Sequence, residues 1–172
     1  MYTFEQHIHN YAVWTAARAS QRGFTTTRKI KIAIESTSLQ QFVKKSPNVN
    51  SSKFESLHRQ WAKELMVSLK KQKVNSILIT YGRVAKIIAI YLKTSVIIRD
   101  NASTKLCSII HPPIDFIFLK NISNQSTLKD LKNYKWTRLN EKQYWDICNR
   151  IKNEFNHFNW RLEEYWSPEL AI

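Results

Sequence analysis

Residues 80–92 decide the fold; they read Thr80-Tyr81-Gly82-Arg83-Val84-Ala85-Lys86-Ile87-Ile88-Ala89-Ile90-Tyr91-Leu92. Threonine is a favourable helix N-cap, and apolar residues then occupy nearly every position of the following helix surface. A helix that is apolar almost all round must be covered by other elements on most sides. The stretch therefore predicts a central helix that begins near Thr80.

A helix over residues 52–71 carries a stripe that would cover part of that central helix. Its apolar residues recur at steps of three and four, which is the spacing of one helix face: Phe54, Leu57, Trp61, Leu65 and Leu69. The capping-box pattern Ser52-Lys53-Phe54-Glu55 predicts its start. This stripe, the central helix and a helix expected after Pro113 together form the expected core, which includes Trp61, Leu65, Ile87, Ile88, Tyr91 and Phe118.

Cap signals and one apolar segment predict further helices along the chain. The cap signals are a capping box at 3–6, threonines at 25–27, a proline at Pro113 and another capping box at 140–143, and the apolar segment is 39–43. Proline is favourable at the first helical position, so Pro113 predicts a helix with Asp115 in its first turn. Only two Gly and four Pro occur, which argues against a multi-stranded β-sandwich with many tight turns.

The fold class that follows is mainly α, with residues 1–172 forming a single compact multi-helix domain. One alternative stays open over about 95–110. There Val96–Ile98 and Leu106–Ile110 have the apolar, β-branched character of two short strands, which a small β-hairpin would pair.

Composition excludes several classes of protein and of site. With so few glycines there is no clustered Gly loop, as P-loop and dinucleotide-binding proteins require. Cys107 and Cys148 are too isolated for a zinc framework, so we expect reduced thiols and neither a metal nor a cofactor. The longest apolar run is interrupted by Lys93, and the N-terminus lacks a secretory pattern. A cytoplasmic location and no membrane partner are expected.

The charge is strongly basic and unevenly distributed. The net charge is +14, and residues 51–106 hold eleven Lys or Arg against three acids. Such an excess is typical of proteins that bind a polyanion, so DNA or RNA is the expected partner. We predict that the binding surface includes Arg59, Lys63, Lys70, Lys71, Gly82 and Arg83. Gly82 and Arg83 lie near a helix N-terminus, where free N–H groups are able to bind phosphate.

Two short segments carry residues that could do chemistry. Lys86 lies on the most apolar helix, where desolvation favours the neutral, nucleophilic amine; a lysine that extends to solvent is the plainer interpretation. His111 and Asp115 flank the double proline of His111-Pro112-Pro113-Ile114-Asp115, which would hold an acid–base pair in fixed geometry. We expect Lys86 and Asp115 to share a concave site with His111 at its edge. A plain Lys–Asp salt bridge is the favoured version of this site, and a catalytic pair facing a flipped nucleotide is the other.

The first helix carries an aromatic and basic stripe, His7, Tyr11, Trp14 and Arg18, at spacings of four, three and four. Exposed aromatic side chains stack on bases, and basic ones bind phosphates. An aromatic residue at helical spacing is also typical of a core, and that is the interpretation favoured for Trp14. His7 and His9 point to different helix faces and make no metal site.

Two resemblances rest on quoted motifs. The first resemblance is to uncharacterised bacterial proteins of integron cassettes and other mobile elements, and it implies no activity. It rests on the segments 81–86 and 111–115 and on Tyr11-Ala12-Val13-Trp14-Thr15-Ala16-Ala17-Arg18-Ala19. The order of a helix with Lys86 and a later helix with Asp115 also resembles 8-oxoguanine-type DNA glycosylases. That resemblance implies Lys86 as a nucleophile and Asp115 as its electrostatic partner. The glycine-rich hairpin of those glycosylases is missing.

Three functions remain open at this point. The first is a nucleic-acid-binding protein of a mobile element or defence system, the second is a glycosylase or lyase that acts on a flipped base, and the third is a structural or interaction module that forms a homo-oligomer. Salt dependence of binding separates the third from the others, and covalent trapping separates the second from the first.

Overall fold

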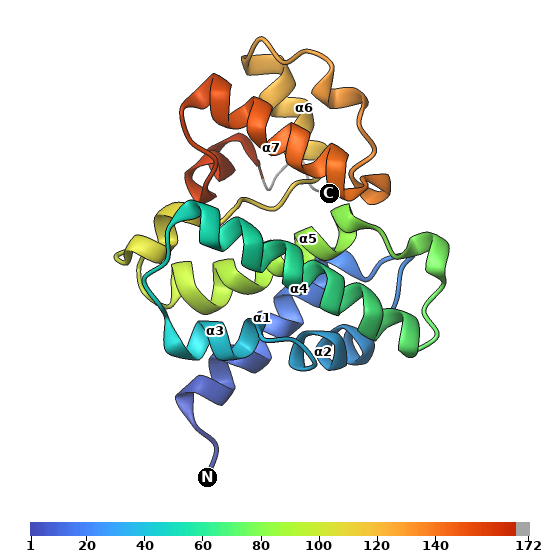
Figure 1. Ribbon diagram of the computed structural model, residues 1–172, viewed down its shortest axis with the longest axis vertical. Helices are drawn as coiled ribbons and strands as arrows, with labels where there is room; N and C mark the ends of the chain where they lie inside the picture. Colours follow the sequence, from blue (N-terminus) through green and yellow to red (C-terminus); the bar gives the residue numbers. More distant parts are fainter. Residues whose placement is uncertain (168–172) are drawn as a thin grey trace.

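The computed structural model describes residues 1–167, and its regular structure is helical throughout that part of the chain (Figure 1). The α-helices are α1 (Phe4–Ser20), α2 (Thr27–Glu35), α3 (Leu39–Lys45), α4 (Ser51–Lys71), α5 (Tyr81–Leu92), α6 (Phe116–Gln125) and α7 (Glu141–Phe155). Short 3₁₀ turns are η1 (Ser76–Leu78), η3 (Lys105–Ile109), η4 (Leu131–Asn133), η5 (Trp136–Arg138) and η6 (Trp160–Tyr165), and η2 (Lys93–Ile98) is π-helical. The mainly α prediction is confirmed.

Helix α5 is the central element, as its composition predicts. It packs against both α1 and α4, and every residue of α5 except Ile90 is buried. The predicted core side chains lie where expected: Trp61, Leu65, Ile87, Ile88 and Phe118 are fully buried, and Tyr91 is 1% exposed. One apolar cluster runs from α1 to η6, so α6 and α7, which lie together at the top of Figure 1, share a core with α1–α5.

Helix caps follow the sequence at four starts and depart from it at two. Thr3 and Asn140 form the predicted capping boxes, Thr26 caps α2, and Thr80 caps α5. The predicted box at Ser52 is wrong, because Asn50 accepts the hydrogen bond from the Lys53 N–H instead. The start at Pro113 is wrong too: Asp115 is the N-cap of α6, which begins at Phe116.

The β-hairpin alternative over 95–110 is wrong. The chain continues from α5 into π-helical η2, and residues 105–109 form the 3₁₀ turn η3. A helix buries Val96 and Ile97 against the existing core, which two isolated strands would not do as well. Asn101 and Ala102, both with positive φ, then turn the chain. The Ala102 N–H donates to the Ile97 carbonyl at 2.8 Å, which closes the wide π-helical turn.

A close approach at Gly82 positions η5 against α5. A Cβ at residue 82 would lie 2.0 Å from the carbonyl oxygen of Trp136, so no other residue fits without movement. The Gly82 N–H donates to the Leu139 carbonyl at 3.0 Å across the same contact. This packing brings the Trp136 side chain beside the middle of α5. Within residues 1–167, no helix has the length and apolar character needed to cross a bilayer.

Candidate functional site

Lys86 and Asp115 meet in the folded chain. The Lys86 Nζ donates to the Asp115 Oδ2 at 3.1 Å, and the side chains are only 10% and 14% exposed. The same Nζ lies 4.4 Å from the centre of the Trp136 ring, within the range of a cation–π interaction. The predicted pairing is therefore confirmed, and α5, α6 and η5 each supply one member of the cluster.

Asp115 is held by more than the lysine. As the N-cap of α6, its Oδ1 accepts the Phe118 N–H at 3.0 Å, and its Oδ2 also accepts the Trp166 Nε1–H at 3.2 Å. Three donors on one carboxylate fix its orientation and occupy most of its acceptor positions. Asp115 is therefore a rigid anchor for Lys86.

A cleft of about 760 Å³ opens beside this pair, within the size range of ligand-binding pockets. It is lined by four cationic residues from α1, the turn after it and α5, against one acid, Asp115. The four are Arg18, Arg22, Arg83 and Lys86. Its aromatic lining is Phe116, Trp136 and Trp166, and Phe116 is 56% exposed. We call this the basic cleft.

A smaller cavity of about 290 Å³ shares Lys86, Asp115 and Trp166 with the basic cleft. A second ion pair, Lys93 with Glu163, lines it. Burial raises the pKa of the Glu163 carboxyl, and the adjacent Lys93 opposes that rise. Two lysines and two carboxylates from different elements therefore border one cavity, an arrangement that no single helix face in the sequence reveals.

The aromatic stripe of α1 lies on the surface beside these cavities. Tyr11 and Trp14 stack with ring centres 5.7 Å apart and planes 22° apart, and they are 55% and 50% exposed. The core interpretation of Trp14 is therefore wrong. Tyr11 lines the smaller cavity and Arg18 lines the basic cleft, so part of the predicted stripe borders the site.

Gly82 and Arg83 have different places from those predicted. The Gly82 N–H already donates to Leu139, and the Arg83 N–H lies 3.4 Å from the Thr80 Oγ1. The predicted phosphate site at these backbone groups is therefore wrong. The Arg83 side chain, however, lines the basic cleft, with its guanidinium 4.8 Å from the centre of the Phe24 ring.

His111 does not lie at the edge of the Lys86–Asp115 site, so that expectation is wrong. Its ring is 6% exposed, shares a 3.0 Å hydrogen bond with the Tyr144 hydroxyl and packs on Phe158. Burial lowers the pKa of His111 to about 3. Neighbouring His58, fully buried, shares a 3.1 Å hydrogen bond with the Tyr81 hydroxyl, and burial lowers its pKa as well. Both histidines belong to a buried aromatic network.

The predicted basic residues of α4 line no part of the basic cleft. Arg59 pairs with Glu141 at 2.9 Å and lies 4.0 Å from the centre of the Trp145 ring, so it joins α4 to α7. Lys63, Lys70 and Lys71 are exposed on the same helix. They form a second basic surface, which we call the α4 surface.

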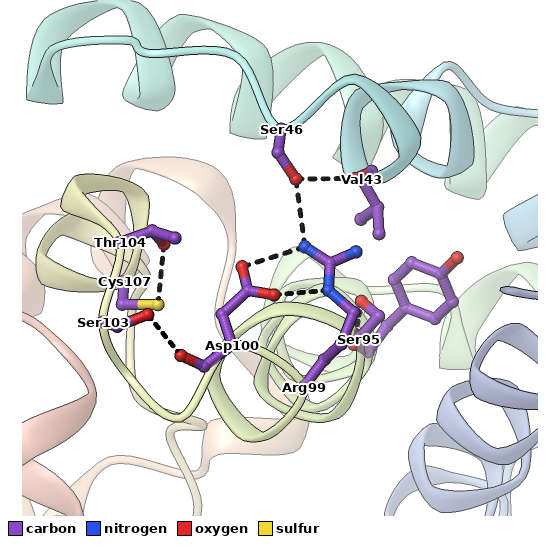
Figure 2. Close-up of polar contacts among 9 residues, drawn as sticks. Val43, Ser46, Ser95, Arg99, Asp100, Ser103, Thr104 and Cys107 are labelled. Atoms are coloured by element: carbon purple, nitrogen blue, oxygen red, sulfur yellow. Dashed lines mark hydrogen bonds and ion pairs between the residues drawn. The ribbon is translucent and has the colours of Figure 1, made fainter. Parts of the chain in front are cut away.

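A further cavity of about 440 Å³ lies between α1, α3 and the end of α5. Arg99 is one of its polar lining residues, and Figure 2 shows its guanidinium directed at both Asp100 and Ser46. The Arg99 Nε and Nη2 donate to the Asp100 carboxylate at 2.5 and 2.9 Å, and Nη2 also donates to the Ser46 Oγ at 3.0 Å. This arginine therefore has both an ion-pair partner and a hydroxyl partner within the chain.

Residues 1–167 bring no three His, Cys, Asp or Glu side chains together as metal ligands. Compared with known protein families, curated proteins and solved structures, the chain shows no match in any of the three. The function must therefore be argued from the geometry of the basic cleft. Five residues of the basic cleft were not predicted from the sequence: Ser20, Arg22, Phe116, Trp136 and Trp166. The sequence holds one signal for them, the helical spacing of four that places Arg22 on the same side as Arg18.

Proposed function

We propose that this protein binds single-stranded or unpaired nucleic acid, DNA or RNA, in the basic cleft. The observation that carries the proposal is the combination, in a single concave surface, of four cationic side chains against one acid with three aromatic side chains, of which Phe116 is exposed and the other two are half-buried. Single-stranded binding sites combine these two features, because phosphates pair with the cations and bases stack on the aromatic rings.

Two pieces of geometry support a path for the strand. The stacked rings of Tyr11 and Trp14 lie on α1, the helix that also contributes Arg18 to the cleft. Phe116 lies at the start of α6 and is 56% exposed. Bases that stack on these rings must be unpaired, which favours a single strand over an intact duplex.

The test compares the basic cleft with the α4 surface. Binding of a fluorescently labelled oligothymidylate is measured by anisotropy over a range of salt concentrations. The double variant Arg18→Gln/Arg22→Gln removes two charges from the cleft, and Lys70→Gln/Lys71→Gln removes two from the α4 surface. We expect the cleft variant to bind more weakly and with a shallower dependence of log affinity on log salt. The α4 variant should retain most of the affinity.

Equal losses in both double variants would mean that only the overall charge matters, and the cleft assignment would then fail. A greater loss in the α4 variant would locate the binding at the surface predicted from the sequence instead. Affinity that does not change with salt in any variant would rule out electrostatic phosphate binding altogether.

A second candidate, a base-excision enzyme or lyase that uses Lys86, is favoured by the contact between Lys86 and Asp115 inside the cleft. The Lys86 amine would attack C1′ of a sugar and form a C–N bond while the bond to the leaving base, or to oxygen at an abasic site, breaks and the leaving group takes up a proton. Opening of the sugar ring at C1′–O4′, with loss of the second amine proton, then gives the imine that borohydride reduces. The amine must first give up a proton, and Asp115, at 3.1 Å, is the nearest acceptor. Borohydride should then trap a covalent adduct with abasic DNA, and Lys86→Gln should abolish it. If wild-type protein binds the abasic DNA but forms no covalent adduct, the enzymatic candidate is wrong and the nucleic-acid-binding function remains.

A further inference from the structure

Two residues that line the basic cleft each carry a buried polar atom that has no hydrogen-bond partner. Among residues 1–167, only three buried side-chain nitrogen or oxygen atoms lack one: Ser20 Oγ, Arg83 Nε and His157 Nε2. The first two belong to residues that line the basic cleft. Buried polar groups in folded proteins nearly always have a partner, so two orphan atoms on residues of one cleft call for an explanation.

Arg83 is the more unusual of the two because it carries a charge. Its residue is only 9% exposed, and no carboxylate of the described chain forms an ion pair with it. Asp115, the acid that lines the cleft, already accepts from Lys86 and Trp166 and caps α6. Arg99 shows the usual outcome elsewhere in the same fold, with a carboxylate and a hydroxyl on its guanidinium (Figure 2).

The Phe24 ring compensates only part of the cost of burying Arg83. A cation–π contact replaces only part of the hydration that a buried cation loses, because an aromatic ring supplies no hydrogen-bond acceptor in the plane of the guanidinium. The guanidinium has five N–H donors in a planar fork, a geometry that matches the oxygens of a phosphate group. Ser20 adds a hydroxyl from the end of α1, and the exposed Arg18 and Arg22 stand at the outer part of the same cleft.

We infer that Arg83 and Ser20 form an inner subsite for one phosphate group, with Arg22 and Arg18 guiding the phosphate into it. Binding supplies the hydrogen-bond acceptor that the Arg83 Nε lacks and a partner for the Ser20 hydroxyl. Assigning this phosphate to the phosphodiester of a bound strand rests on the proposed function. A free phosphate or a nucleoside monophosphate has the same chemistry and is the other source.

The first experiment measures thermal unfolding with inorganic phosphate, against sodium chloride at equal ionic strength. Wild-type protein should show a higher Tm with phosphate, since a ligand of the native state stabilises it. The phosphate-induced shift should vanish in Arg83→Gln and shrink in Ser20→Ala, and it should persist in Lys70→Gln. Ser20→Ala removes a hydroxyl that has no partner, so this variant is expected to fold. Comparing shifts removes any change in baseline stability.

The second experiment identifies the source of the phosphate by measuring the affinity of each variant for a short oligothymidylate without terminal phosphates and for thymidine monophosphate. A phosphodiester subsite predicts that Arg83→Gln weakens oligothymidylate binding about tenfold, with a salt slope shallower by about 0.7. If Arg83→Gln loses affinity for thymidine monophosphate but binds the oligothymidylate like wild type, the subsite belongs to a free nucleotide.

Failure of this inference and failure of the proposed function give different results. If the oligonucleotide binds but Arg83→Gln and Ser20→Ala bind it like wild type, and phosphate does not raise the Tm, the subsite is wrong and nucleic-acid binding stands. If phosphate stabilises the protein through Arg83 while no oligonucleotide binds, the subsite stands and the proposed function falls.

Discussion

Replacing Gly82 by alanine is expected to destabilise the protein, although alanine is the better helix former. The substitution adds one methyl group in the first turn of α5, where helix propensity alone would favour alanine by about 1 kcal/mol. The new Cβ would lie 2.0 Å from the Trp136 carbonyl oxygen and 3.1 Å from the Leu139 Cβ. The segment around η5 would have to retreat by roughly 1 Å to relieve this contact.

The size of the effect follows from those distances. Overpacking of this kind costs about 1–3 kcal/mol, and the hydrogen bond from the Gly82 N–H to Leu139 adds about 1 kcal/mol if it is stretched. After subtracting the gain in propensity, we expect a net loss of about 1–3 kcal/mol in the free energy of unfolding. For a chain of this size that corresponds to a fall in Tm of several degrees.

Equilibrium urea unfolding, followed by tryptophan fluorescence, measures this loss. Gly23→Ala is the matched control, because Gly23 has a φ of +63° and a Cβ added there would meet no atom within 4 Å. Its cost should come from backbone strain alone, about 1 kcal/mol. A Gly82→Ala protein as stable as wild type would refute the close approach of η5 to α5, and with it the placement of Trp136 beside Lys86.

Three further predictions concern stability. Trp61→Ala, at a fully buried position, should cost about 3–5 kcal/mol in urea unfolding, and a neutral effect would remove Trp61 from the core. His58 and His111 are held neutral by burial, which lowers their pKa values, that of His111 to about 3. Because the unfolded chain protonates near pH 6.5, it binds more protons than the native state below that pH. Stability should therefore fall as pH falls from about 6.5, by up to ~1.4 kcal/mol per pH unit for each histidine, and a flat profile in acid unfolding curves would contradict this. Asp115→Ala should destabilise more than Lys86→Met in the same assay, since Asp115 also caps α6, a contact that contributes about 1 kcal/mol; equal losses would mean that the cap does not matter.

The sequence by itself determined the helical class, the central helix and much of the core. Thr80 and the apolar residues after it specify α5 through local rules, namely a side-chain cap and burial on nearly all faces. Phe54, Trp61 and Leu65 are buried because a spacing of three and four places them on one side of α4. These features depend on residues within a turn or two of each other, so the sequence alone was enough to predict them.

The tertiary structure decided the rest, because the deciding contacts join residues distant along the chain. Residues 96–98 are as compatible with a strand as with a helix, and the burial of Val96 and Ile97 against the core selects the helix. Trp14 has the same helical spacing as a core residue, yet within residues 1–167 no element packs over it, so it remains exposed. The basic cleft combines Arg18 and Arg22 with Arg83, Phe116 and Trp136, and no local pattern relates these positions. Their proximity results from the packing of α1 and η5 against α5 and from the contact of Lys86 with Asp115 at the start of α6, which depends on how all the helices fit together.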